Sequence, residues 1–190
     1  GIALAVSITM SGCSTISDWF ADEEELEIRR LKPIEAKFTP ELVWDQDIGD
    51  GVDHYFSRLR PVYAYDKLFA ADRHGAVVAM EPETGKVLWQ KDFAQFRSEG
   101  MMSSITKLWQ SGETARIGGI SVADRHVFIG TENGYIAAMD AETGELVWEA
   151  TVPGEILAAP AADEGILVVN TGAGSLFGFS TRTGEQLWRH

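Results

Sequence analysis

Few residues of this chain have the types and spacing that catalysis or metal binding requires. Four histidines are spread along its 190 residues, at His54, His74, His126 and His190. Neither a His-Glu-x-x-His nor a Cys-x-x-Cys motif occurs, so no zinc site is indicated. No Gly-x-Ser-x-Gly elbow is present, and Gly172-Ala173-Gly174 lacks the Gly-Lys-Ser/Thr of a phosphate loop. We therefore predict no catalytic residue, no metal site and no cofactor.

One charged triplet occurs twice, as Asp72-Arg73-His74 and Asp124-Arg125-His126. The two copies stand in different registers, because Asp72 lies seventeen residues before the next repeated tryptophan and Asp124 lies twenty-four. A shared catalytic role would require the same register. We expect both triplets to end strands.

The single cysteine follows an apolar stretch, residues 2–10, and the small residues Ser11 and Gly12. A run of about ten apolar residues is too short to span a bilayer and is typical of a secretory signal peptide. Met10-Ser11-Gly12-Cys13 resembles a bacterial lipobox. We expect residues 1–12 to be the C-terminal part of a signal peptide and Cys13 to carry the lipid, palmitate included. The alternative is a buried or free thiol at Cys13.

An acidic segment follows the cysteine. Residues 13–40 include Asp22, Glu23, Glu24, Glu25 and Glu27, and such a segment is typical of a flexible, solvated tether. The whole chain has a formal net charge of -13, which argues against a nucleic-acid partner. Ser14, after the cysteine, lacks the aspartate associated with retention in the inner membrane, so we expect the outer membrane.

A seven-residue segment occurs three times, each copy carrying Thr-Gly and ending in tryptophan, at 83–89, 142–148 and 182–188. A further glycine stands fourteen residues before each tryptophan. Fixed spacing of this kind defines a repeat protein. The positions that we expect to be structural are Gly75, Gly85, Trp89, Gly134, Gly144, Trp148, Gly174, Gly184 and Trp188.

Each copy divides into short apolar stretches separated by turns. Those of the middle copy are 119–123, 127–131, 135–140 and 145–151, and those of the third are 158–162, 166–170, 175–180 and 185 onward. We expect Asn133-Gly134 to supply the positive φ angles of a tight hairpin, and the apolar run 166–169 predicts a strand covered on both faces. Four antiparallel strands per repeat indicate an all-β fold, a β-propeller of four-stranded blades.

Residues 41–47 resemble a fourth strand, with Trp44 in the tryptophan position, but no earlier stretch could pair with it. We expect its partners to come from the far end of a longer chain. A ring of seven or eight blades needs roughly 300 to 350 residues. We therefore expect residues 41–190 to form a partial propeller, which is the N-terminal fragment of an eight-bladed ring.

About nineteen extra residues separate the first and second copies, within 96–115. Met101, Ile105 and Leu108 lie at i, i+4 and i+7, with Trp109 beside them, which favours a short amphipathic helix. We expect this helix to cap its own blade. The alternative is a contact surface for a partner, with Met101, Ile105 and Trp109 as the candidate residues.

The repeated Thr-Gly-x-x-x-Trp pattern resembles the PQQ-like propeller repeat, which is WD40-like in blade architecture and in which the tryptophan packs between blades. Residues near the first copy carry a closer resemblance: Phe38-Thr39-Pro40, Trp44, Gly49, Gly51, Tyr55, Leu59, Pro61, Ala70-Ala71-Asp72-Arg73, Gly75, Gly85-Lys86 and Trp89. With the lipobox and the tether, the chain from about Met10 is similar to the BamB family, propeller lipoproteins of the outer-membrane β-barrel assembly machinery.

That resemblance implies a non-catalytic scaffold, anchored by lipid in the outer membrane and facing the periplasm, that aids folding and insertion of β-barrel proteins. The implied partners are a BamA-like central barrel subunit and unfolded outer-membrane proteins. The family's best-known contact loops lie beyond Trp188, so no binding residue is carried over.

Two other classes of protein share this repeat. A PQQ-dependent quinoprotein dehydrogenase would use PQQ with Ca²⁺, and that family typically has a vicinal cysteine pair, which a chain with only Cys13 cannot form. A periplasmic ligand-binding propeller, such as a sensor ectodomain, would be expected to have a transmembrane helix.

Overall fold

The computed structural model of the chain describes residues 37–93 and 116–190. Contacts divide the chain into two units, Gly1–Glu41 and Leu42–His190, and all of the described strands lie in the second. The described residues contain strands and no helix, so none of them forms a helix that could cross a membrane.

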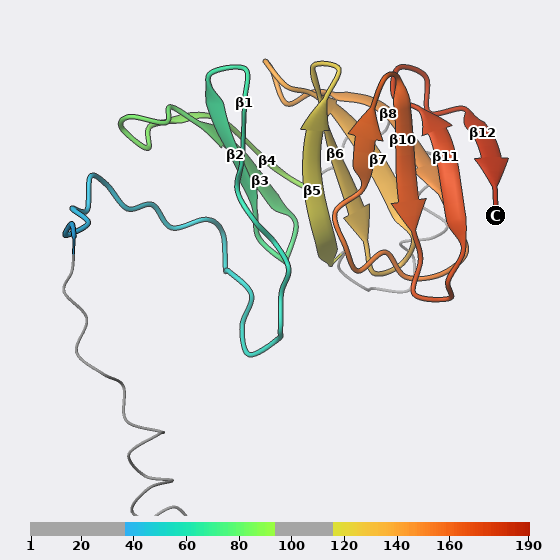
Figure 1. The fold of residues 1–190 in the computed structure, drawn as a ribbon, viewed down its shortest axis with the longest axis horizontal. Coiled ribbons are helices and arrows are strands. Elements are labelled where there is room, and N and C mark those ends of the chain that lie inside the picture. Colours follow the sequence, from blue (N-terminus) through green and yellow to red (C-terminus); the bar gives the residue numbers. More distant parts are fainter. Residues whose placement is uncertain (1–36, 94–115) are drawn as a thin grey trace, which may run out of the picture. The chain divides into compact units, whose positions relative to one another are not determined.

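The strands form three four-stranded antiparallel sheets (Figure 1). The first sheet contains β1 (Val62–Ala64), β2 (Lys67–Ala71), β3 (Ala76–Met80) and β4 (Val87–Asp92). The second contains β5 (Ile117–Ala123), β6 (His126–Thr131), β7 (Tyr135–Asp140) and β8 (Leu146–Thr151). The third contains β9 (Ala161–Asp163), β10 (Ile166–Asn170), β11 (Leu176–Ser180) and β12 (Gln186–Arg189). Strands consecutive in sequence are neighbours in every sheet, so the predicted all-β fold of four-stranded blades is confirmed.

Two-residue turns join the first and second strands of each sheet. Tyr65-Asp66 and Asp124-Arg125 have φ values between 48° and 61°, and Glu164-Gly165 has 47° and 81°. Two successive positive φ angles match the right-handed twist of a hairpin. Asn133-Gly134 was predicted to supply such a pair, and that prediction is wrong: only Gly134 has positive φ, and its N–H donates to Thr131 O at 3.0 Å.

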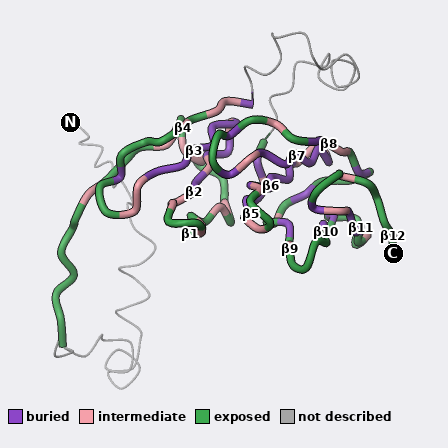
Figure 2. Tube along the Cα trace, turned by 90° about the horizontal axis from the view of Figure 1, so that it is seen from above, coloured by how far each residue is buried: buried purple, intermediate pink, exposed green. Residues whose placement is uncertain are grey.

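The middle sheet is covered on both faces. In β6, Val127 and Ile129 pack into a core with Phe69 of the first sheet, whereas Phe128 packs into a second core with Leu167 of the third sheet. Successive side chains of a strand point to opposite faces of the sheet, so alternate residues of β6 enter different cores. Figure 2 shows the resulting buried positions along the inner strands of this sheet.

The third sheet is covered on one face only within the described residues. Leu167 and Val169 of β10 are fully buried, whereas Ile166 is 38% exposed and Val168 is partly exposed. The predicted strand at residues 166–169 is confirmed as part of β10, and its coverage on the second face stays a prediction. The reason is that the described residues place a neighbouring sheet, the second, against one of its faces only.

Residues 41–47 were predicted to form a strand, and the structure assigns none there. A strand requires a ladder of backbone hydrogen bonds to a neighbour, and no described residue pairs with this segment. Trp44 nevertheless occupies the predicted tryptophan position, since its Nε1–H donates to Pro82 O at 2.8 Å and its ring lies over Gly85.

The turn between β7 and β8 is stabilised by a carboxylate. Asp140 Oδ1 accepts hydrogen bonds from the backbone N–H groups of Glu142, at 2.9 Å, and Thr143, at 2.8 Å. Burial raises the pKa of Asp140, but these hydrogen bonds outweigh burial and hold it below its ordinary value. The ionised form is therefore favoured by folding.

We expect Asp140→Asn to lower the free energy of unfolding at pH 7 by about 0.5–1 kcal/mol, a small value because the site is partly exposed. A depressed folded-state pKa contributes stability above the unfolded pKa, which is about 3.9, and loses it as pH falls. The difference between variant and wild type should therefore shrink in urea unfolding below about pH 4. The exposed Glu185→Gln is the control; a difference that grows on acidification would contradict the assignment.

Candidate functional site

The repeated tryptophans connect each sheet to the next. Trp89 Nε1–H donates to Ala141 O at 3.2 Å, and Trp148 Nε1–H donates to Thr181 O at 2.7 Å. Together with the bond from Trp44, these are equivalent contacts, because each acceptor lies three residues before the glycine of the next Thr-Gly turn. The tryptophans thus hold successive sheets together.

The glycine of each Thr-Gly turn is required by the tryptophan that covers it. Gly85, Gly144 and Gly184 have φ between 70° and 71°, a region that side chains disfavour. A Cβ built on Gly144 would lie 2.7 Å from the ring of Trp89, and one on Gly184 would lie 2.6 Å from the ring of Trp148. Backbone conformation and close approach therefore both select glycine.

Asp72 of the first triplet is a buried structural group. Its Oδ1 accepts the backbone N–H groups of Gly75 and Ala76 at 2.8 and 2.7 Å, and its Oδ2 accepts that of Asp50 at 2.9 Å. The carboxylate is 3% exposed, and its three hydrogen bonds to backbone amides compensate the cost of burying it. This arrangement fixes the β2–β3 turn against the segment that precedes β1.

Arg73 connects the first sheet to the second. Its Nε donates to Glu132 Oε1 at 3.1 Å and its Nη2 to the same oxygen, while its guanidinium lies 3.9 Å from the ring centroid of Tyr55. Arg116 Nη1 lies 3.7 Å from Glu132 Oε2, so two arginines share one carboxylate. The backbone N–H of Ile117 also donates to Arg73 O at 3.0 Å, which ties β5 to this turn.

The second triplet has a different environment. Asp124 Oδ2 accepts the hydroxyl of Thr181 at 2.6 Å, so it joins the second and third sheets at the opposite end of the strands from Arg73. His126 Nδ1 is buried, and none of the described residues supplies it with a hydrogen-bond partner. His74 Nε2 lies 2.8 Å from Asp53 Oδ2 on the surface. The structure does not bring the predicted triplets together.

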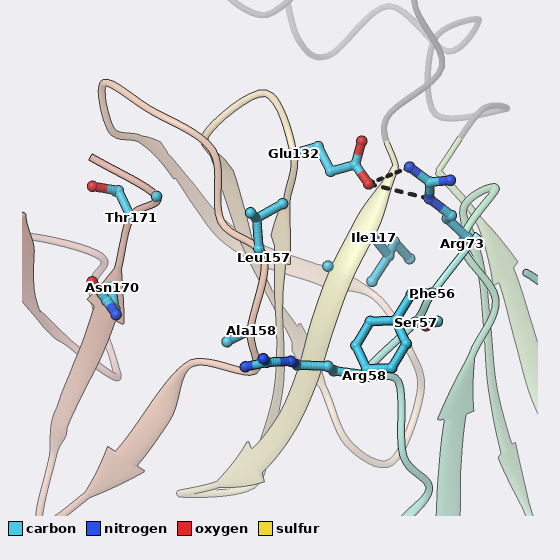
Figure 3. Close-up of a pocket in the computed structure, with 12 residues that line it drawn as sticks. Phe56, Ser57, Arg58, Arg73, Ile117, Glu132, Leu157, Ala158, Asn170 and Thr171 are labelled. Atoms are coloured by element: carbon cyan, nitrogen blue, oxygen red, sulfur yellow. Dashed lines mark hydrogen bonds and ion pairs between the residues drawn. The ribbon is translucent and has the colours of Figure 1, made fainter. Parts of the chain in front are cut away.

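A cavity of about 370 Å³ lies at the end of the sheets where β2, β6 and β10 end (Figure 3). We call it the inner cavity. One wall is the segment before β1, and the opposite wall is the segment before β9. Its lining residues are Phe56, Ser57, Arg58, Arg73, Ile117, Gly118, Glu132, Leu157, Ala158, Asn170, Thr171 and Gly172. Figure 3 shows the bonds between Arg73 and Glu132 at its edge.

Sequence reasoning did not select the residues of this cavity. Phe56, Arg58 and Leu157 lie outside the repeated segment, in stretches without a regular pattern. The repeated triplet Asp72-Arg73-His74 contains one residue of this cavity, Arg73, but that triplet predicts only the end of a strand.

Several predicted site residues lie outside the described residues: Cys13, Met101, Ile105 and Trp109. Within residues 37–93 and 116–190, no group of three or more His, Cys, Asp or Glu side chains is placed to hold a metal ion.

Comparison with known proteins gives consistent matches. A relative from Alteromonas naphthalenivorans, named outer membrane protein assembly factor BamB, is 76% identical over 190 residues, which is 100% of this chain and 46% of that protein. A relative of the same name from Shewanella oneidensis is 38% identical over 99% of this chain and 44% of its own length. The chain spans about half the length of the curated relatives it matches.

A solved structure, BamB from Moraxella catarrhalis, matches with a TM-score of 0.54 at 22% identity, over 69% of this chain and 34% of that one, which shows a shared fold. The family model described as outer membrane protein assembly factor BamB matches residues 34–102 and 103–190. By these matches, this chain belongs to the family of outer membrane protein assembly factor BamB.

Proposed function

We propose that this chain is part of a non-catalytic scaffold lipoprotein that assists the assembly of β-barrel proteins in the outer membrane. The observation that carries the proposal is the 76% identity, over the whole chain, to a protein named outer membrane protein assembly factor BamB. The structure supports it physically, because tryptophan contacts and buried side chains connect the three sheets into a frame whose turns can carry contact surfaces.

The partner in this proposal is a BamA-like central barrel subunit, with unfolded outer-membrane proteins as further ligands. The insertion that contains Met101, Ile105 and Trp109 remains a candidate contact surface, and it stays a prediction. The inner cavity adds a second candidate, which lies within the described residues.

An enzymatic role has no specific observation in its favour. Propeller dehydrogenases share the fold, and the quinohemoprotein alcohol dehydrogenase from Comamonas testosteroni matches with a TM-score of 0.53 over 75% of this chain and 21% of its own. At 24% identity that likeness concerns the fold alone. The relatives at higher identity are named as assembly factors.

The anchor in this proposal is Cys13, which places the protein in the outer membrane, facing the periplasm. Several acyl chains, each contributing about 0.8 kcal/mol per buried CH₂, would make the attachment effectively permanent. The acidic residues of 13–40 then serve as the tether between the lipid and the propeller.

Two measurements test the proposal with the full-length, affinity-tagged protein in its native host. Wild type should be found in outer-membrane fractions and should co-purify with a BamA-like subunit identified by mass spectrometry. We expect wild type and Ser14→Ala to incorporate labelled palmitate, and Cys13→Ser to incorporate none, because the acylated thiol is lost. Wild type that purifies without any barrel-assembly subunit would contradict the scaffold role, and Cys13→Ser that still incorporates the label would contradict the anchor.

A further inference from the structure

We propose that the inner cavity binds an extended, acidic segment of a partner polypeptide, with a carboxylate on Arg58 and an apolar side chain between Phe56 and Leu157. The inference rests on the proposed function only in taking the occupant to be a polypeptide. It adds the chemistry by which that polypeptide is recognised.

The apolar part of the site is exposed to a degree that is unusual for a concave surface. Phe56 is 88% exposed and Leu157 is 47% exposed, although both line the cavity. Ile117, at 2% exposure, also lines the cavity. Figure 3 shows Phe56 on one side of the cavity and Leu157 on the other. Exposed apolar side chains gathered at a cavity mark an interaction site more often than scattered ones do.

The charged part of the site is basic, in contrast to the acidic chain. Arg73 and Arg116 share the carboxylate of Glu132, whereas Arg58 has no ion pair or hydrogen bond among the described residues. The charged residues of the lining are therefore two arginines, Arg58 and Arg73, and one carboxylate, Glu132. Glu155 lies beside Gly172 of the lining. The chain as a whole has a net charge of -13.

Charge complementarity therefore favours an acidic occupant. A guanidinium binds a carboxylate through two parallel hydrogen bonds, and Arg58 has all of its donors free within the described residues. A basic segment would place a like charge beside Arg58 and be repelled.

The shape of the cavity favours a polypeptide segment over a small molecule. Small ligands are usually enclosed over most of their surface. Within residues 37–93 and 116–190, Phe56 and Leu157 are exposed at the rim, so these residues would cover an occupant on one side only. Ser57 and Asn170 add side-chain hydrogen-bonding groups to the lining, which suit the backbone of an extended segment.

The walls of the cavity are held in place without a ligand. Gly172 N–H donates to Glu155 O at 2.8 Å, and Ile156 N–H donates to Thr131 O at 3.0 Å, which fixes the segment before β9. On the opposite side, Arg73 N–H donates to Gly51 O at 3.0 Å and the Arg73 guanidinium lies 3.9 Å from the ring centroid of Tyr55, which connects the segment before β1 to the turn after β2. A site formed in advance loses less conformational entropy when it binds.

The test uses the full-length protein and a fluorescein-labelled peptide of about ten residues in which leucine alternates with aspartate, an extended pattern. Binding is followed by fluorescence anisotropy. We expect the peptide to bind, Arg58→Glu to weaken binding by at least about tenfold, and Arg58→Gln to weaken it less. Phe56→Ser should also weaken binding. Arg182→Glu, the same charge change at an exposed position outside the cavity, should leave affinity unchanged.

Two matched peptides complete the design, one with asparagine and one with lysine in place of aspartate. The inference fails if the aspartate peptide does not bind, if the lysine peptide binds equally well, or if Arg58→Glu has no effect in a protein whose circular dichroism is unchanged. Co-purification with a barrel-assembly subunit is measured separately. If wild type co-purifies with a barrel-assembly subunit but does not bind the aspartate peptide, the inference alone is overturned. If wild type binds the peptide but co-purifies with no barrel-assembly subunit, the proposed function alone is overturned.

Discussion

Replacing Trp148 with alanine is expected to lower the free energy of unfolding of the full-length protein by about 3–5 kcal/mol. The indole is 8% exposed, packs against Gly184 and lies 5.9 Å from the ring of Phe128 between centroids. Its removal leaves a cavity between the second and third sheets. It also leaves the carbonyl of Thr181, now bonded at 2.7 Å, without its donor.

Two further variants separate the contributions of Trp148. Trp148→Phe keeps an aromatic ring but loses the Nε1–H, so its cost should be intermediate, about 1–3 kcal/mol. Leu187→Ala removes an apolar side chain that is 49% exposed and should cost less than about 1 kcal/mol. Urea unfolding followed by circular dichroism measures all three. A loss below about 1 kcal/mol for Trp148→Ala would show that the tryptophan contacts do not hold the sheets together.

The repeat was predictable because its contacts are tied to a fixed register. The tryptophan and the Thr-Gly turn recur at constant spacing, and the structure places Trp89 and Trp148 over the glycine of the next repeat. The same register placed Trp44 over Gly85 although residues 41–47 form no strand. A side-chain contact needs only two residues in place, whereas a strand needs a neighbour with which to pair.

The inner cavity could not be predicted in the same way. Arg58 lies 99 residues before Leu157, and Arg58, Leu157 and Thr171 lie in three segments that have no common pattern. They meet because three sheets stack with the same ends together. The turns could likewise be predicted only in part from the sequence, since Tyr65 and Asp66 both adopt positive φ although neither is glycine or asparagine.

The second large effect is expected from Gly119→Ala, which should lower the free energy of unfolding by about 3 kcal/mol, at the upper end of the cost of overpacking. Gly119 lies in β5, where a Cβ would stand 2.1 Å from the backbone nitrogen of Ala159 and 2.3 Å from its Cα. The obstacle is backbone rather than a flexible side chain. The change therefore forces β5 away from the segment before β9.

The matched control is Gly172→Ala, because a Cβ there would meet nothing closer than 3.8 Å. Neither glycine is in the left-handed region, so the two variants differ in close approach and not in backbone strain. Gly172→Ala should be neutral, or stabilising by about 0.4–1 kcal/mol through the unfolded chain. Urea unfolding of the full-length protein measures both. Equal stability of the two variants would show that β5 can separate from the third sheet at little cost, and the inner cavity would then lack the fixed wall on which peptide binding depends.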